Sequence, residues 1–188
     1  MSKPRILAFA GSARKQSFNR KLLALAVEYA RRADLEVEHI ELADYPMPIM
    51  DEDLEAEQGQ PANATAIRKK MLEADGLLLA CPEYNSSITP LMKNVIDWVS
   101  RKEAGGGGLE PYRDKKALLI AASPGKSGGE RALDSVRSIL ENIGVSVFED
   151  GFTLARAGEA FDDHDQLTDR LHTRRLETTV EAFSRFMR

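Results

Sequence analysis

The sequence predicts a single α/β domain built as a three-layer α/β/α sandwich, around a five-stranded parallel sheet of strand order 2-1-3-4-5. Short apolar runs alternate with longer amphipathic segments, a pattern typical of βαβ units. The 188 residues, 43% of them hydrophobic, can form one core, because a chain of this size buries about 70% of the surface that it exposes when unfolded. We therefore assign residues 1–188 to one domain.

The predicted strands are short runs of mostly apolar residues. Three of them read RILAFA, GLLLA and KALLIAA without regular polar alternation, as expected for central parallel strands buried on both faces. A fourth run alternates between apolar and polar residues. In chain order, the predicted strands cover residues 5–10, 35–42, 76–80, 116–122 and 145–149.

Five predicted helices separate or follow these strands. In the first, apolar residues recur at three- and four-residue spacing between residues 22 and 30. Residues 43–62 contain three prolines and many acids, so we predict a long loop there. Residues 105–108 are consecutive glycines, which indicates flexibility. The other predicted helices cover about residues 63–74, 90–100, 129–142 and 165–186.

Composition excludes several classes of function. The 26 Lys and Arg against 30 Asp and Glu give a net charge of −4, whereas a nucleic-acid binder needs a concentrated basic face. No apolar run approaches the roughly 20 residues that span a bilayer, so no membrane association is expected. The apolar residues 6–10 are too few for a signal peptide, and a single cysteine, Cys81, suits a reducing compartment. These features predict a cytoplasmic protein.

The loop after the first predicted strand, GSARKQSFNRKLL, has the outline of an anion site. It precedes a helix, where unpaired backbone N–H groups and the helix dipole favour negative charge, and an arginine can bond phosphate through two N–H groups. Neither a Walker spacing nor GxGxxG is present, so one terminal phosphate fits best, and FMN leads on fold grounds. A helix capped by Ser17 explains the same residues without a ligand. The candidate residues are Ser12, Arg14, Ser17 and Asn19.

The loop after the third predicted strand continues into a helix as CPEYNSSITPLMKNVIDW. It places polar side chains and a tyrosine at the predicted mouth of the sheet. A strand-to-helix turn, with Thr89 as the cap and Pro90 as the first helical residue, is the plain alternative, and both interpretations can hold. Cys81 has no arginine six positions later, as a phosphatase nucleophile would, and it is predicted to be an inert apolar residue. The candidate residues are Pro82, Glu83, Tyr84 and Asn85.

The loop after the fourth predicted strand, SPGKSGG, is rich in glycine. Glycines let the backbone approach a planar ligand closely, which makes Ser123 and Gly125 candidates. Residues 162–165 (DDHD) resemble metal ligands, but their spacing matches no metal-binding loop and acids are expected at the start of the last helix, so we predict no metal site. His39 and His172 have no visible triad partners, so hydrolysis is not predicted.

With these three loops in this order, the sequence resembles the NADPH-dependent FMN reductases, a flavodoxin-like family that includes bacterial quinone and chromate reductases and azoreductases. GSARKQSFNRKL resembles the family's phosphate loop, PEYNSSITPLMKNVIDW its isoalloxazine loop and SPGKSGG its third flavin loop. PEYN followed by KNVIDW is the most specific part, and the resemblance covers about residues 6–149.

The resemblance implies FMN as the cofactor and NADPH or NADH as the co-substrate, with the hydride chemistry carried by the flavin rather than by a catalytic side chain. It implies a ping-pong cycle with a small-molecule acceptor, such as a quinone, an azo or nitro compound, chromate or free flavin, and a homodimer or tetramer. By resemblance, the phosphate is held by Ser12, Arg14, Ser17 and Asn19, one side of the ring is flanked by Pro82, Glu83, Tyr84 and Asn85, and the other is closed by Ser123 and Gly125.

The sequence departs from the family at two places. Ser86 stands where the family usually has glycine, and the segment RKEAGGGGLEPYRDKK, residues 101–116, is longer and richer in glycine than is usual in the family. Both lie where an acceptor would enter, so they affect acceptor preference more than flavin binding. A flavodoxin-type electron carrier is the alternative function, which an arginine in the phosphate loop, Arg14, disfavours. A regulatory domain that has lost the flavin is a third possibility.

Overall fold

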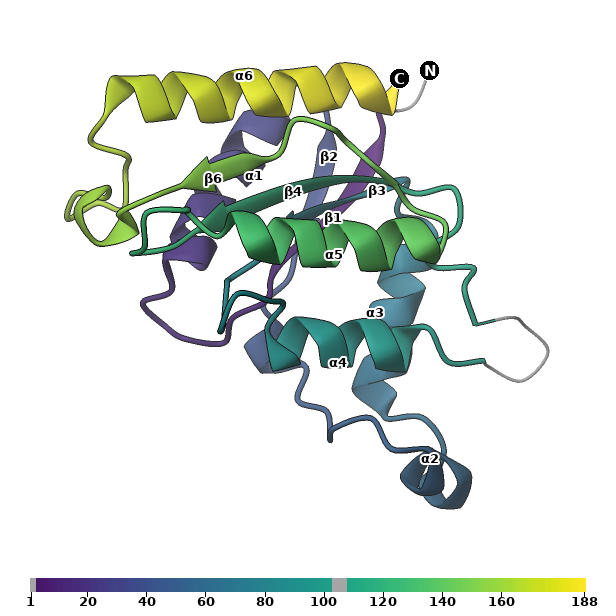
Figure 1. Ribbon diagram of the computed structural model, residues 1–188. Helices are drawn as coiled ribbons and strands as arrows, with labels where there is room; N and C mark the ends of the chain where they lie inside the picture. Colours follow the sequence, from purple (N-terminus) through teal and green to yellow (C-terminus); the bar gives the residue numbers. More distant parts are fainter. Residues whose placement is uncertain (1–2, 103–107) are drawn as a thin grey trace.

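The computed structural model in Figure 1 describes residues 3–102 and 108–188. Residues 105–107 of the predicted flexible stretch lie outside this part of the chain. The strands are β1 (Arg5–Ala10), β2 (Glu36–His39), β3 (Gly76–Ala80), β4 (Lys116–Ala122), β5 (Ser146–Val147) and β6 (Phe152–Leu154). The α-helices are α1 (Phe18–Arg32), α2 (Glu52–Gln58), α3 (Ala62–Glu73), α4 (Pro90–Val99), α5 (Glu130–Asn142) and α6 (Arg170–Met187).

The sheet runs β2-β1-β3-β4-β5 with every pair parallel, which confirms the predicted order and the flavodoxin-like arrangement. In its register, Ala10 lies opposite Ala80, and Ala80 lies opposite Ile120. The three central strands therefore end close together at one edge. The loops that follow β1, β3 and β4 all begin at this edge.

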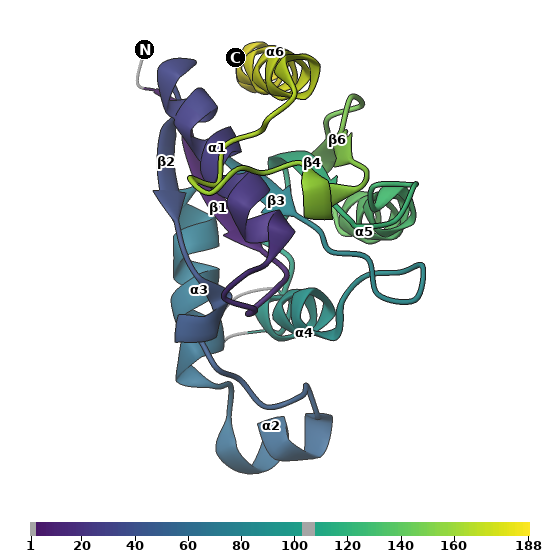
Figure 2. The same cartoon turned by 90° about the vertical axis from the view of Figure 1, so that its left-hand side faces the viewer.

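Alternate side chains of the central strands point to opposite faces of the sheet, and each face carries its own core. Ile6 and Ala8 of β1 pack in the cluster that includes residues of α1 and α6. Leu7 and Phe9 pack in the other cluster, with residues of α3, α4 and α5. Figures 1 and 2 show α6 and α4 on opposite sides of the sheet, so the predicted three layers are confirmed. In the described residues, no helix has the length and apolar character needed to cross a bilayer.

The fifth strand is interrupted, so the prediction of one strand over residues 145–149 is wrong. β5 pairs with the start of β4 and β6 with its end. Between these pairings, β4 advances three residues, from Ala117 to Ile120, and its partner advances five, from Val147 to Phe152. The two extra residues interrupt the pairing and separate β5 from β6. Neither strand is long enough to show a periodic pattern of apolar residues in the sequence.

Three further predictions of element boundaries are wrong. Residues 43–62 are not entirely loop, because Asp51 caps α2 by accepting the N–H groups two and three residues later, at 2.8 and 3.2 Å. The last helix begins at Arg170 instead of about residue 165, since Asp169 is its cap. β2 is four residues long, half of the predicted length.

Gly76 starts β3 at a point where the neighbours leave no room for a side chain. A Cβ added there would lie 2.7 Å from the Lys116 carbonyl oxygen and 2.9 Å from the Met187 side chain. We expect Gly76→Ala to lower the free energy of unfolding by about 1–3 kcal/mol through overpacking, measured by urea denaturation. Ser146→Ala, at an exposed β5 residue, is the control and should change it by less than about 0.5 kcal/mol. Unchanged stability of Gly76→Ala would contradict this packing.

Candidate functional site

Three segments meet at the carboxyl edge of the central strands, and a side chain joins each pair of them. We name them loop 1 (residues 11–19), loop 2 (residues 81–89) and loop 3 (residues 122–131). The three ties are Thr89 Oγ1 to the Gly11 carbonyl at 2.8 Å, the Asn19 amide to the Ala122 backbone at 2.7 and 3.0 Å, and Arg131 Nη1 to Ser86 Oγ at 3.1 Å. The structure therefore brings together the three segments that the sequence predicted as ligand loops.

Loop 1 contains two buried hydroxyl groups. Ser12 and Ser17 are 5% and 4% exposed. Ser12 Oγ accepts one long bond, 3.4 Å, from the Arg14 N–H. Ser17 occupies the N-cap position of α1, but its side chain makes no capping hydrogen bond. The alternative of a capped helix is therefore correct in placing Ser17 at the N-cap position and wrong in expecting a capping hydrogen bond from its side chain. The hydroxyl groups of Ser12 and Ser17 can still form hydrogen bonds with a ligand.

Asn19 is the candidate whose side chain is already engaged. Its Nδ2 donates to the Ala122 carbonyl at 2.7 Å, and its Oδ1 accepts the Ala122 N–H at 3.0 Å. The side chain is buried, and the two residues are 103 positions apart. In this structure, Asn19 therefore links the start of α1 to the end of β4 through one of its two N–H groups and its carbonyl oxygen, and its role toward a phosphate stays a prediction.

The start of α1 and the exposed Arg14 supply positive potential. The Arg14 carbonyl accepts the Ser17 N–H at 3.2 Å and Arg20 Nη1 at 3.1 Å, and these two bonds shape the loop. The first turn of α1 carries no acidic residue, so its N–H groups face no anion of their own helix. This combination can bind a phosphate group.

Loop 2 contains a tight turn in an unusual backbone conformation. The N–H groups of Tyr84 and Ser87 each donate to the other residue's carbonyl, at 3.1 Å. The two residues between them, Asn85 and Ser86, have φ of 51° and 65°, in the left-handed region. Glycine adopts this region without penalty, whereas another residue pays about 1–2 kcal/mol. Ser86 therefore adopts this conformation at a cost that a glycine would avoid.

Glu83 supplies a polar atom inside loop 2 that lacks a partner. Its Oε2 is buried and, among the described residues, accepts no hydrogen bond, which is unfavourable for a carboxylate. Pro82 beside it is buried, and Tyr84 is 47% exposed. FMN carries hydrogen-bond donors on its ring and ribityl chain, so an unpartnered acceptor together with an exposed aromatic ring fits this group.

Loop 3 is braced by the segment that follows β6. The Ser123 and Gly125 carbonyls accept the N–H groups of Ala157 and Arg156 at 3.0 and 3.2 Å, and the Gly125 N–H donates to Ser123 Oγ at 3.2 Å. Gly129 has φ of 96°, and a Cβ added there would lie 2.7 Å from a side chain of β4. The backbone at Gly129 therefore lies directly against the end of β4.

The helix after loop 2 holds a distant segment, which the sequence did not predict. Asn94 Nδ2 and Trp98 Nε1 both donate to the Pro48 carbonyl at 2.8 Å, and Asn94 Oδ1 accepts the Met50 N–H at 2.8 Å. The KNVIDW motif thus anchors the proline-rich segment and leaves Ile49 84% exposed. The available signal was two side chains with polar tips at i, i+4 spacing, but the carbonyl that they share lies 46 and 50 positions away from them.

Cys81 and Thr89 behave as predicted. Cys81 is fully buried at the end of β3, and burial raises the pKa of its thiol well above the ordinary range, so a thiolate nucleophile is excluded there. Thr89 caps α4, since its Oγ1 accepts the Met92 N–H at 3.2 Å, and Pro90 is the first helical residue. The same Thr89 hydroxyl makes the tie to loop 1.

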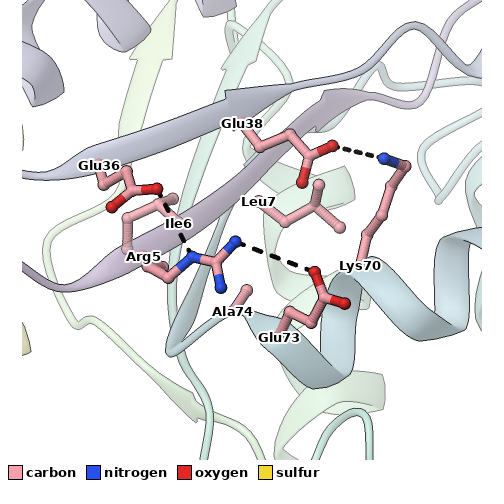
Figure 3. A pocket seen from close by; sticks show the side chains of 8 residues that line it. All are labelled: Arg5, Ile6, Leu7, Glu36, Glu38, Lys70, Glu73 and Ala74. Atoms are coloured by element: carbon pink, nitrogen blue, oxygen red, sulfur yellow. Dashed lines mark hydrogen bonds and ion pairs between the residues drawn. The ribbon is translucent and has the colours of Figure 1, made fainter.

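A second group of charged residues surrounds a small hollow beside β1, β2 and α3 (Figure 3). Its volume of about 20 Å³ is enough for about one water molecule. Arg5 pairs with Glu36 and Glu73 at 3.6 and 3.9 Å, and Lys70 pairs with Glu38. These charges satisfy one another and the space is too small for a cofactor, so this hollow is not the candidate site.

Residues 162–165 form a turn and not the helix start that was predicted. The Asp162 carboxylate accepts the N–H groups of Gln166 and His164 at 2.9 and 2.8 Å. These backbone bonds, that of Gln166 foremost, hold the pKa of the Asp162 carboxyl below its usual range. In the part of the chain that the structure describes, no three His, Cys, Asp or Glu side chains are grouped to hold a metal ion.

Comparison with known proteins shows which family this chain belongs to. The family of NADPH-dependent FMN reductases matches residues 4–159. An NADPH:quinone oxidoreductase of Arabidopsis thaliana is 32% identical over 97% of this chain and 91% of its own length. An NAD(P)H-dependent FMN reductase of Pseudomonas aeruginosa is 31% identical over 98% of this chain and 95% of its own length.

A solved structure has the same fold over nearly its whole length. It is the flavoenzyme NAD(P)H:(acceptor) oxidoreductase of Paracoccus denitrificans, which superposes with a TM-score of 0.80 at 25% identity and covers 98% of this chain and 97% of that one. The family that the sequence resemblance predicted is thereby confirmed. The chain belongs to the NADPH-dependent FMN reductase family.

Proposed function

We propose that this protein is an FMN-dependent oxidoreductase that takes reducing equivalents from NADPH or NADH and passes them to a small-molecule acceptor such as a quinone. Family membership supports the enzyme class and the cofactor. The observation that carries the proposal is that two of the three tied loops contain buried polar groups with spare bonding capacity. These groups are the Ser12 and Ser17 hydroxyls and Glu83 Oε2.

Loop 1 is the proposed phosphate site. Arg14 offers two N–H donors to phosphate oxygens, and Ser12 and Ser17 offer hydroxyl donors beside the free N–H groups of α1. Asn19 fixes this loop to β4 through one N–H and its carbonyl oxygen, and its second N–H is a further donor for the phosphate. Because this phosphate site is preorganised, less conformational entropy is lost when the phosphate binds.

Loops 2 and 3 are the proposed ring site. Pro82, Glu83, Tyr84 and Asn85 would flank the isoalloxazine on one side, and Ser123 and Gly125 would close the other. When bound, FMN supplies the hydride chemistry for both half-reactions of a ping-pong cycle, first with NAD(P)H and then with the acceptor. The protein's part is to orient the ring and to donate backbone hydrogen bonds to its polar edge, without a side chain that acts as acid or base.

The acceptor class and the assembly are also proposals. A quinone, an azo or nitro compound, chromate or free flavin would enter beside Tyr84. We propose a homodimer or a tetramer, supported by large apolar side chains at the surface, Tyr84 at 47% and Ile49 at 84% exposure. Light scattering, compared with the monomer mass of 20.8 kDa, measures this state. We place the protein in the cytoplasm, on the grounds of its composition.

The flavodoxin-type carrier is less well supported than the reductase, because the similar proteins are reductases of small molecules. An anaerobic titration of the FMN-loaded protein separates the two. We expect NADPH or NADH to bleach the visible flavin spectrum and a quinone to restore it. A flavin spectrum that neither nucleotide changes would favour the carrier, and failure to bind FMN would favour the regulatory domain.

Arg14→Ala should weaken FMN binding and leave riboflavin binding unchanged, because riboflavin lacks the phosphate. Loss of charge-assisted bonds of about 1.5–3 kcal/mol corresponds to a tenfold to hundredfold rise in the Kd of FMN. Quenching of flavin fluorescence on the apoprotein measures both ligands. Lys15→Ala, which removes the neighbouring exposed charge, is the control and should raise the Kd less than about threefold. Equal Kd values for Arg14→Ala and the parent would contradict the assignment.

Asn19→Ala should lower stability as well as FMN affinity. It leaves the buried N–H and carbonyl of Ala122 without partners, which costs about 2–4 kcal/mol in the free energy of unfolding. Thermal unfolding of the apoprotein measures this loss, and Arg14→Ala, on the exposed side of the same loop, should leave the melting temperature unchanged. An apoprotein as stable as the parent would show that the Asn19 bonds do not hold the edge together.

A further inference from the structure

One of the three ties between the loops differs from the other two. The Thr89 and Asn19 ties are buried and end on backbone groups. The third joins two exposed side chains, with Arg131 Nη1 donating to Ser86 Oγ at 3.1 Å. We infer that Arg131 is a positioning residue of the flavin site, which acts through Ser86 to hold the loop 2 turn against the start of α5. This inference rests on the proposed function.

The turn needs an external support. Its two backbone bonds join Tyr84 and Ser87 to each other and not to the rest of the molecule. Its central residues, Asn85 and Ser86, are both left-handed, which is unfavourable for residues that carry a Cβ. Within residues 3–102 and 108–188, the Arg131 bond is the hydrogen bond that connects the turn to another element. Because the turn is strained and this hydrogen bond links it to another element, we expect loss of the bond to change the position of the turn.

Arg131 is held on a rigid base. Gly128 and Gly129, with φ of 66° and 96°, turn the chain into α5, and a Cβ added at Gly129 would lie 2.7 Å from Ala121 Cβ. The first turn of α5 therefore sits directly on β4, and the Arg131 carbonyl accepts the Ser135 hydroxyl at 2.9 Å within the helix. The guanidinium extends from the start of α5 to Ser86. The position of the turn therefore depends on the position of the helix.

Ser86 gains a function from this contact that glycine could not have. Glycine at this position would relieve the backbone strain but would offer no hydroxyl to Arg131. The chain keeps a serine in a conformation that disfavours it, and the Ser86 hydroxyl is the atom that the guanidinium bonds. The pair therefore joins loop 2 to loop 3, the two segments that flank the ring in the proposed function, and leaves loop 1 untouched.

This placement predicts a specific pattern of flavin affinities. Loss of the tie should loosen the ring site and not the phosphate site, so FMN and riboflavin should weaken by the same factor. We expect Arg131→Ala and Ser86→Ala each to raise the Kd of both flavins about threefold to tenfold. Because both remove the same bond, the double variant should be no weaker than either single one. Arg131→Lys keeps a charged donor and should recover part of the affinity.

Fluorescence titration of the apoproteins with FMN and riboflavin tests this pattern. Asp134→Ala, which changes an exposed charge on the same helix, is the control and should not alter either Kd. Kd values that stay unchanged in both single variants, or losses that multiply in the double variant, would overturn the inference while the parent still binds FMN. A loss for FMN alone would overturn it as well, since that pattern belongs to a phosphate contact.

If the parent protein bound no flavin, the proposed function would be overturned. Amide hydrogen exchange in the apoprotein would still test the inference about Arg131. The Tyr84 and Ser87 amides close the turn, so Arg131→Ala and Ser86→Ala should accelerate their exchange by a similar factor. Exchange at the Ala122 amide, which belongs to the Asn19 tie, should stay unchanged in both variants. Unaltered exchange at Tyr84 and Ser87 would show that Arg131 does not hold the turn.

Discussion

The candidate site depends most on the double hydrogen bond between the Asn19 amide and the Ala122 backbone. It joins the first helix to the end of β4 across 103 positions, in a place that water does not reach. A buried amide that has satisfied both of its groups has one favourable position, so it fixes the first turn of α1 relative to the sheet. Ser12, Ser17 and the unpaired N–H groups of α1 are thereby presented beside loop 3, and the remaining two ties add loop 2 to this frame.

The three ties differ in how rigid they make the site. The parallel register of β1, β3 and β4 brings the loops to one edge, and the Thr89 and Asn19 ties hold loop 1 from the inside. Loop 2 is held from the inside through Thr89 and from the outside through Arg131. In the proposed function, the phosphate site is therefore held by buried bonds, whereas the ring site depends in part on the exposed bond between Arg131 and Ser86.

The sequence predicted the central strands to the residue, because continuous apolar runs flanked by polar turns leave little choice of boundary. β5 and β6 could not be predicted, since two- and three-residue strands have no period of their own. α2 could have been found from Asp51 and the acids after it, but the neighbouring prolines outweighed that signal. That the three predicted loops meet at one edge followed from the strand order. The engagement of Asn19 with Ala122 and of Arg131 with Ser86 could not, because each depends on a partner that only the folded chain brings near.

In the proposed function, one ligand contacts all three tied loops at the carboxyl edge of the sheet. Amide hydrogen exchange, measured with and without FMN, tests it most directly. We expect slower exchange on FMN binding in residues 11–19, 82–87 and 123–129 together, with no change in β2 and α3 around the hollow of Figure 3. Slower exchange in one loop alone, or around that hollow, would contradict it.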